Sequence, residues 1–319
     1  MKNIILTSVL VVGLANAHVC LQRDQQTSAQ VHEPQLTESS GLTYSKRYAD
    51  RLYHINDSGS SPEFFITDSS GHNSRRIPIS LVFFIDTEDI AVGPCLGEKS
   101  CLVIGDVGDN WRFRPSIQFY FFKESRLSDH YLDDLAAQGL DLSPDLVLSV
   151  SYPDHAHNAE GFFLDEKGNL NILTKEKNGT TAQIFSLAAG QIILPSNGKD
   201  LPSKPHPKFK RVTKIDLKKL MPPSLIPFNS EITGAAYNEK SQSIAVLTYD
   251  GFFEFTAQSL LTPSKTSFKS GLDYVFTPVR AGNQQEGIAY VPNSSDLVIS
   301  SETGKGQGLT PLLRLNCLK

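Results

Sequence analysis

The chain has 319 residues, enough to bury the core of one large β domain or of two smaller domains. Charged residues make up 20% of the sequence, and the formal net charge is -4. This balance excludes the strong basic field that draws a protein to nucleic acid, so we expect no nucleic-acid partner.

The N-terminus reads MKNIILTSVLVVGLANA, with a basic residue near its start and an Ala-Asn-Ala ending. This pattern over residues 1–17 predicts a cleaved secretory signal peptide, which leaves residues 18–319 as the mature chain. The apolar run is too short to span a membrane, and no later segment is long enough. We therefore expect a secreted or periplasmic protein without a membrane span. A lipid anchor on Cys20 is the minor alternative, because His18 and Val19 stand where small residues usually precede a lipidated cysteine.

Five segments of the mature chain repeat one outline: a polar residue, Gly or Asp, a short apolar run, a polar turn and a second apolar run. Each outline predicts a β-hairpin. In several units a third and a fourth apolar run follow, as in EFFIT and RRIPISL after the first hairpin. Groups of about four short strands, repeated at tens of residues, predict an all-β fold, a β-propeller. The segments are residues 40–59, 88–110, 160–179, 233–251 and 286–304.

The spacing of the repeats favours five blades in a single domain over residues 18–319. Two of the intervals fit one blade of about 40–50 residues, and the two longer intervals contain insertions. One insertion, SDHYLDDLAAQG, predicts a short helix capped by Ser128 and ended by Gly139. The other is rich in Pro and Lys and covers residues 194–229. A sixth, degenerate blade inside an insertion is the alternative, and we expect a terminal strand to complete the last blade.

Four cysteines in an exported chain indicate two disulfides, for which three connectivities exist. Cys95 and Cys101 flank a short loop, whereas Cys20 and Cys317 lie at the two ends of the mature chain. A bridge between the ends would close the ring covalently and could contribute about 3–5 kcal/mol in the chain-entropy model. Independent buried thiols are the alternative.

One polar residue precedes the Gly or Asp of every repeat. In a propeller the first strand of each blade lines the central channel, so these side chains would face one axis. Carboxylates held close together must share protons or bind a cation, and oxygen ligands suit Ca²⁺ or Mg²⁺. We therefore predict a divalent cation site, with calcium favoured, on Glu88, Glu160 and Glu286. Solvated turn residues and a water-filled channel are the alternatives. The aligned residues are Ser40, Glu88, Glu160, Thr233 and Glu286.

A second set of polar residues lies at the end of the second strand of each unit. A small polar ligand needs such a mixture of acid, base, phenol and amide, whereas packing does not. Asp57 and Asp109 in the adjoining loops belong to this predicted ligand site, although Asp in such loops also forms Asx-turns. The strand-end residues are Asn56, Asp106, Lys175, Tyr249 and Glu302.

The segment DHAHNAEG raises the question of zinc, because His155 and His157 alternate as on one face of a strand beside Asp154. The sequence offers no matching third cluster, so zinc is not the favoured interpretation. For an enzyme, the candidate catalytic residues are Glu160, His157 and Lys175, as proton carriers and as the stabiliser of an anionic oxygen. GxSxG, P-loop and HExxH motifs are absent from the sequence.

Residues 204–220, KPHPKFKRVTKIDLKKL, form a local basic run. Such a run could dock an acidic protein surface. The favoured interpretation is an outer blade edge, where lysines prevent strand-to-strand aggregation.

At YHINDSG, DTEDIAVGP, VIGDVGDN and DHAHNAEGF the chain resembles a family of exported bacterial β-propellers, whose recurring phrases are NDSG, DxEDIA, GDxGDN and AEG. The resemblance covers most of the mature chain. More distantly, the chain is similar to the SdiA-regulated propellers and to the group described as the esterase-like activity of phytase, which share the fold and often hold a cation in the channel. Thr87 stands where an aromatic residue is common, and the Lys/Pro insertion is an addition. By this resemblance the motif residues are Asn56, Asp57, Ser58, Asp86, Glu88, Asp89, Asp106, Asp109 and Asn110.

Together these patterns predict a monomeric β-propeller with an acidic axial channel, which binds a divalent cation and a small polar or anionic ligand. The first alternative is a metal-assisted phosphoester or ester hydrolase. The second is a protein-interaction scaffold that uses its blade edges and the basic insertion.

Overall fold

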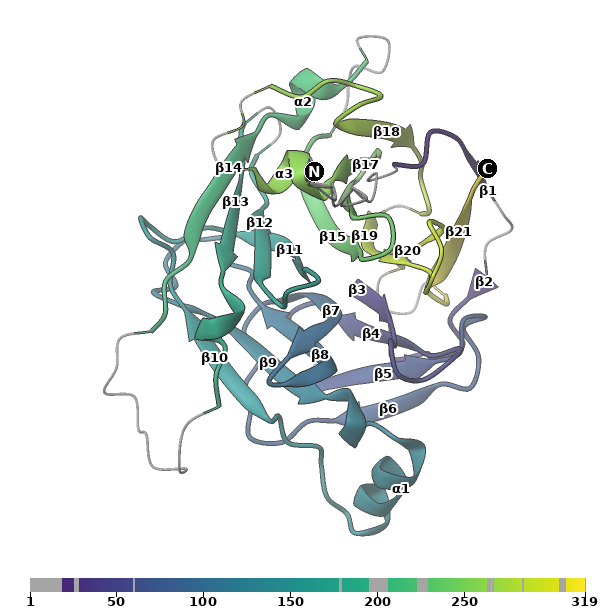
Figure 1. Cartoon of the computed structure of the whole chain (residues 1–319). Coiled ribbons are helices and arrows are strands. Elements are labelled where there is room, and N and C mark those ends of the chain that lie inside the picture. Colours follow the sequence, from purple (N-terminus) through teal and green to yellow (C-terminus); the bar gives the residue numbers. More distant parts are fainter. Residues whose placement is uncertain are drawn as a thin grey trace, which may run out of the picture.

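The computed structural model shows a ring of five antiparallel blades around one axis, four of them four-stranded and the fifth five-stranded (Figure 1). It describes residues 19–25, 29–59, 61–177, 180–194, 206–222, 229–262, 265, 267–282, 284–303 and 308–318. The predicted signal peptide and part of the Pro- and Lys-rich insertion lie outside these residues. The fold class and the blade number predicted from the repeats are both confirmed.

Four blades are built from consecutive strands, and the first strand of each lies innermost (Figure 1). From the axis outward, blade 1 contains β3 (Ser39–Tyr44), β4 (Leu52–Asn56), β5 (Glu63–Thr67) and β6 (Arg75–Pro78). Blade 2 contains β7 (Thr87–Cys95), β8 (Glu98–Asp106), β9 (Ile117–Lys123) and β10 (Leu146–Val150). Blade 3 contains β11 (Ala159–Leu164), β12 (Leu170–Thr174), β13 (Ala182–Leu187) and β14 (Lys210–Ile215). Blade 4 contains β15 (Ile232–Asn238), β16 (Ser243–Thr248), β17 (Gly251–Thr256) and β18 (Tyr274–Pro278).

Blade 5 joins the two ends of the described chain. The N-terminal strand β1 pairs with the C-terminal strand β21 as the outermost strand, and the short β2 pairs with the other half of β21. The predicted closing strand is therefore present. The strands are β19 (Gln284–Tyr290), β20 (Leu297–Glu302), β21 (Pro311–Cys317), β1 (Arg23–Gln25) and β2 (Ala29–Gln30).

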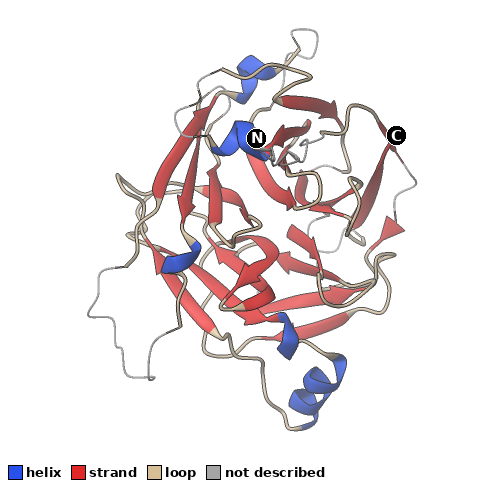
Figure 2. Cartoon of the chain, viewed as in Figure 1, coloured by secondary structure: helices blue, strands red, loops and turns tan. Residues whose placement is uncertain are grey.

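The described helices are short and lie in connections between strands (Figure 2). The predicted helix is α1 (Asp129–Ala137), and the Ser128 side chain caps it by accepting a hydrogen bond from the Tyr131 amide. Gly139 follows with φ +66°, a conformation that glycine adopts without steric cost. The others are η1 (Glu124–Arg126), η2 (Ala189–Gln191), α2 (Leu217–Leu220) and α3 (Ala257–Leu261).

Alternation along the strands gives every pair of neighbouring blades a shared hydrophobic core. On β9, Phe119 and Phe121 pack toward blade 3, whereas Tyr120 and Phe122 pack toward blade 1. The side chains of a strand point alternately to the two faces of its sheet, so a strand buried on both faces needs an uninterrupted apolar run. This requirement explains why these strands contain continuous apolar runs such as FYFF at residues 119–122.

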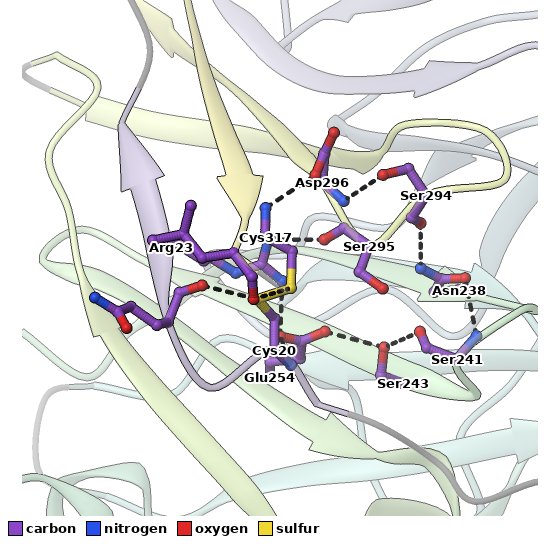
Figure 3. Close-up of a disulfide and its surroundings, with 12 residues drawn as sticks. Cys20, Arg23, Asn238, Ser241, Ser243, Glu254, Ser294, Ser295, Asp296 and Cys317 are labelled. Carbon is purple, nitrogen blue, oxygen red and sulfur yellow. Dashed lines mark hydrogen bonds and ion pairs between the residues drawn. A yellow bond between two sulfur atoms is a disulfide. The ribbon is translucent and has the colours of Figure 1, made fainter.

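A covalent bridge and a buried ion pair fasten the closing strand. Cys20 is bonded to Cys317 across 297 residues of chain, and Cys95 is bonded to Cys101 within the β7–β8 hairpin. Glu254 on β17 accepts hydrogen bonds from the Cys20 amide at 3.0 Å and from Arg23 Nη2 at 2.7 Å (Figure 3). The N-terminal segment is thereby tied to blade 4 as well as to blade 5.

The axis itself is filled where the inner strands come closest. Asp89 stands where the other four repeats have glycine, and its carboxylate accepts hydrogen bonds from the amides of Ile90, of Phe162 in blade 3 and of Ala235 in blade 4. A Cβ on Gly41 would lie 2.7 Å from Asp89 Oδ1, so the side chain occupies space that a glycine leaves. A buried aspartate thus links inner strands across the axis, between its two ends.

Candidate functional site

A β-bulge occurs at the same repeat position in all five inner strands. The ladder skips one residue between Ser39 and Gly41, and it does so at the equivalent place in β7, β11, β15 and β19. A bulge adds one residue to a strand and re-aims its side chain. The extra residues are the ones that the repeat alignment grouped together: Ser40, Glu88, Glu160, Thr233 and Glu286.

The bulged residues divide into hydroxyls that connect blades and buried carboxylates. Ser40 Oγ donates to the Glu88 carbonyl at 2.6 Å, and Thr233 Oγ1 donates to the Gln285 carbonyl at 2.8 Å, in each case reaching the next blade. Glu88, Glu160 and Glu286 are only 3–4% exposed. Buried carboxylates must be paired, protonated or bound to a cation. The three carboxyl groups at this end of the axis therefore each need a partner, a proton or a bound cation.

A second layer of polar residues comes from the end of the second strand of blades 1, 3, 4 and 5. Asn56 pairs with Ser39 and Asp106 with Thr87, in the positions that Thr174 and Thr248 hold in blades 3 and 4. The strand-end alignment is therefore offset by one residue in blades 1 and 2. In the corrected register Asp57 is the equivalent of Lys175, Tyr249 and Glu302.

Five side chains form a continuous chain of contacts across blades 3, 4 and 5. Lys175 Nζ lies 3.1 Å from Glu160 Oε2 and donates to the Tyr249 hydroxyl, also at 3.1 Å. Tyr249 donates in turn to Glu286 Oε1 at 3.2 Å, and Glu286 is hydrogen-bonded to Glu302. The structure thus brings together the predicted residues Glu160, Lys175, Tyr249, Glu286 and Glu302.

On the other side of the axis Asp57, Asp86 and Glu88 each offer an oxygen within 4.8 Å of the other two. Asp57 comes from blade 1, and the other two come from the start of blade 2. Gly108 adjoins them: a Cβ there would lie 2.3 Å from Glu88 Oε1 and 2.4 Å from Asp86 Oδ2. The missing side chain at Gly108 lets the carboxylates of Glu88 and Asp86 lie against its backbone, and converging carboxylate oxygens are the donors that Ca²⁺ prefers.

Burial and mutual repulsion disfavour the charged forms of these carboxyl groups. Burial raises the pKa of Glu88 well above its usual value, and the neighbouring Glu160, Asp57 and Asp86 raise it further. Burial, followed by the charge of Asp57, raises the pKa of Asp86 to about 6.

The same causes act around Lys175. Burial raises the pKa of Glu160 and outweighs the opposing effect of the Lys175 ammonium. For Lys175, burial lowers the pKa, but the charges of Glu160 and Glu286 and the contact with Tyr249 together raise it more, so the ammonium is retained. Glu160 and Glu88 are hydrogen-bonded to each other, which requires a shared proton in the absence of a cation.

The predicted ligand residues Asn56, Asp106 and Asp109 lie outside this cluster and have local partners. Asn56 bonds to the Glu38 amide and the Gln35 carbonyl. Asp106 is fully buried, and its Oδ1 lies 2.8 Å from Arg114 Nη1. The Asp109 carboxylate accepts hydrogen bonds from the backbone amides of residues 113 and 114. These contacts hold the loops that carry Asp86 and Gly108.

Sequence reasoning did not place Asp86 among the cation ligands, and it missed Asn158. Asp86 stands two residues before Glu88, and the bulge at Glu88 changes which neighbouring side chains share a face. Asn158 donates to Glu160 Oε1 at 3.2 Å and accepts from the Asp109 amide at 2.6 Å. Asn158 stands two residues before Glu160, as Asp86 stands two residues before Glu88. This shared spacing was the sequence signal that could have identified both residues as members of the site.

His157 lies near this cluster but not in it. Its buried ring contacts Asp154, with Nε2 at 3.0 Å from Oδ1, and it packs against Tyr152 and Phe185. The basic run contributes β14, the outer edge of blade 3, as its favoured interpretation predicted.

A hollow of about 460 Å³ lies at the opposite end of the axis. It is lined by the later residues of the inner strands, including Ala91, Ala235 and Ala289. The carboxylate cluster therefore occupies one end of the axis and this hollow the other, with Asp89 between them along β7.

Fold and site together define a five-bladed β-propeller with an acidic cluster at one end of its axis. No protein-family model and no curated protein matches the sequence. The solved structures similar to the chain are β-propeller proteins, and the likeness concerns the fold alone. They include hydrazine synthase of Kuenenia stuttgartiensis (12% identity, 86% of this chain and 70% of that chain, TM-score 0.42). Another is a glucose dehydrogenase (11% identity, 91% of this chain and 99% of that chain, TM-score 0.47). A third is the calcium-binding protein regucalcin of Agrobacterium tumefaciens (10% identity, 91% of this chain and 95% of that chain, TM-score 0.45).

Among the described residues, no helix has the length and hydropathy that crossing a membrane would require.

Proposed function

We propose that this protein is an exported β-propeller that binds a divalent cation, with calcium as the best match, through Asp57, Asp86 and Glu88. The observation that supports the proposal most directly is the convergence of three carboxylates from two blades beside Gly108. Ca²⁺ prefers six to eight oxygen ligands, and carboxylates are its usual protein donors. The two disulfides are in keeping with an oxidising compartment.

The ligand that we propose is a small polar or anionic molecule at the same end of the axis. Lys175 already neutralises Glu160, so a free anion would meet an excess of carboxylates. A bound cation reverses that balance and offers a place for a phosphate or carboxylate oxygen. Tyr249 and Lys175 lie at hydrogen-bonding distance from the remaining carboxylates and would orient the polar groups of the ligand.

Calcium-dependent stability tests the cation site. Calcium at about 100 times its dissociation constant should raise the free energy of unfolding by about 3 kcal/mol at pH 7. Asp86→Asn and Glu88→Gln should lose this gain, whereas Glu239→Gln, a carboxylate at the opposite end of the axis, should keep it. No stabilisation by millimolar calcium, or equal stabilisation of all variants, would contradict the proposal. Elemental analysis of the purified protein would identify a retained ion.

The pH dependence of this effect has a defined sign. The folded-state pKa of Asp86 is raised to about 6, so its carboxyl group favours folding below its unfolded value near 4, and that contribution is lost as the pH rises through 6. Protons and calcium compete for the same oxygens. The gain from calcium should therefore be larger at pH 7 than at pH 5, as thermal unfolding at the two pH values would show.

A metal-assisted phosphoester or ester hydrolase is the second candidate, and the Glu160–Lys175–Tyr249 contacts favour it. Glu160 would hold or move a proton, and Lys175 would stabilise an anionic oxygen. The bound cation would supply Lewis-acid chemistry. Turnover of p-nitrophenyl phosphate or acetate that is lost in Lys175→Ala would support the enzyme. Absence of turnover in a calcium-binding protein leaves the binding function.

A further inference from the structure

Asp154, His155 and His157 gather in the loop between β10 and β11, outside the proposed calcium cluster. His157 Nε2 lies 3.0 Å from Asp154 Oδ1, and His155 Nδ1 lies 3.5 Å from Asp154 Oδ2. Donor atoms bound to one zinc ion at about 2.0–2.1 Å in tetrahedral geometry are about 3.4 Å apart. The His157–Asp154 distance is close to this spacing, and one donor atom from each of the three residues lies within 4.8 Å of the other two.

The surroundings of His157 resemble the outer shell of a metal-binding histidine. Its ring is fully buried, and Nδ1 lies 3.5 Å from Gln183 Nε2 and 3.8 Å from Glu176 Oε1. Histidine ligands generally donate the second ring N–H to a carboxylate or a carbonyl oxygen. Gln183 lies on β13 of blade 3, and Glu176 lies two residues beyond the end of β12 and is paired with Arg112.

An unpartnered buried atom provides an independent observation. Gln183 Oε1 is buried without a hydrogen-bond partner among the described residues. A half-turn of this amide would place Oε1 where it accepts the proton on His157 Nδ1. His157 Nε2 would then present its lone pair toward Asp154 and His155. The orphaned oxygen gains a partner when His157 Nδ1 carries a proton, as it does in the tautomer that a metal ligand at Nε2 needs.

Asp154 and His155 complete the donor set. Asp154 is held in place by Arg211 and lies beside both imidazole rings. Arg211 binds Oδ2, which leaves Oδ1 for an ion. The side chain of His155 is 63% exposed, so a coordination position on this side would be open to solvent.

We propose that Asp154, His155 and His157 bind a transition-metal ion, with zinc as the best match, and leave a position for water or an external ligand. Two imidazoles and one carboxylate suit zinc, nickel or copper, whereas calcium prefers oxygen donors alone. The sequence disfavoured zinc because it lacked a further cluster. The structure supplies the outer shell from Gln183 and Glu176, residues far from the loop in sequence. This site is independent of the proposed calcium site.

Zinc titration of the mature protein, stripped with chelator and followed by calorimetry, tests the proposal. We expect one zinc ion per chain and at least a 100-fold loss of affinity in His155→Ala, whose exposed side chain can be removed without disturbing the core. Gln183→Ala should weaken binding about 10- to 100-fold. His130→Ala is the matched control, because His130 is exposed and lies 3.5 Å from Asp134 but belongs to no group of three possible metal ligands among the described residues.

The proposal is overturned if the wild type binds no zinc at 100 μM, or if His155→Ala binds zinc as tightly as the wild type. Cobalt(II) in place of zinc should give visible absorption typical of four or five ligands in the wild type and His130→Ala, but not in His155→Ala. Asp86→Asn should leave zinc affinity unchanged, and His155→Ala should leave the calcium effect unchanged. Failure of one site would therefore be distinguishable from failure of the other.

Discussion

His54 on β4 is a histidine that the fold keeps neutral. Its side chain is fully buried, and Nε2 lies 2.9 Å from Thr67 Oγ1. Thr67 gives its own hydroxyl proton to the Asp68 carbonyl, so Nε2 must be the donor, and Nδ1 remains without a partner among the described residues. Burial lowers the pKa of His54 to about 3 because a charged ring there would have no compensating contact.

Replacing His54 by Leu should remove part of the acid sensitivity of the protein. Below pH 6.5 the unfolded chain takes up a proton at this residue while the folded protein does not until about pH 3, so stability falls as the pH is lowered. Between pH 7 and 4.5 the wild type should lose about 2–3 kcal/mol more than His54→Leu. Urea unfolding at both pH values measures the difference. His130→Leu, on an exposed ring, should behave as the wild type, and equal losses in all three proteins would contradict the assignment.

Gly108 tests the shape of the proposed calcium site. An alanine methyl group would lie 2.3 Å from Glu88 Oε1 and would force the carboxylates apart. Gly108→Ala should therefore abolish the calcium-dependent rise in melting temperature. Gly190→Ala is the matched control, because no atom lies within 4 Å of its added Cβ. A full calcium response in Gly108→Ala would show that the ion is bound elsewhere.

At the scale of elements, the inner strands share a bulge but differ in what occupies the next position. Glycine follows the bulge in four blades and lets the backbones approach, as at Gly161, where a Cβ would lie 2.8 Å from the Gly234 carbonyl carbon. Asp89 in β7 fills the remaining space and accepts amide hydrogens from three blades. The innermost strand of blade 2 is thereby hydrogen-bonded to the innermost strands of blades 3 and 4.

Removing the Asp89 carboxylate should destabilise the whole ring. Asp89→Ala leaves three buried amides unsatisfied, at about 1–3 kcal/mol for each group that finds no other partner, so a total loss of about 3–5 kcal/mol is expected. Asp89→Asn keeps one acceptor oxygen and should lose less. Denaturant unfolding monitored by tyrosine fluorescence measures both. A loss below 1 kcal/mol in Asp89→Ala would mean that water replaces the carboxylate.

The elements were more predictable than the site. Gly, Asp and turn signals repeat with each blade, so the hairpins, the capped helix and the five-fold count follow from local sequence. The contacts of Asp57 depend on register, and a one-residue offset exchanges the inward and outward faces of a strand, which is why Asn56 and Asp106 were grouped with Lys175. Gln183 lies on a different strand from His157, and no local pattern reports that contact.

At the scale of the whole molecule, the ring depends on how its ends are joined. The Cys20–Cys317 bridge spans almost the entire mature chain, whereas the Cys95–Cys101 bridge closes a loop of 6 residues. Blade 5 takes its outermost strand from the N-terminus, so without the bridge that blade is held by β1–β21 pairing and by the buried Arg23–Glu254 ion pair. A propeller whose last blade opens exposes the core that it shares with blade 1.

The two disulfides should therefore contribute unequally to stability. Loop entropy in the unfolded chain gives about 5 kcal/mol for the long loop and about 2 kcal/mol for the short one, so the double variant Cys20→Ser/Cys317→Ser should lose about 3 kcal/mol more than Cys95→Ser/Cys101→Ser. Reversible denaturant unfolding under oxidising conditions compares the two, and hydrogen exchange should show the first variant opening first at blade 5. If the short-loop variant is the less stable one, local packing of the hairpin rather than closure of the ring determines the stability of the propeller.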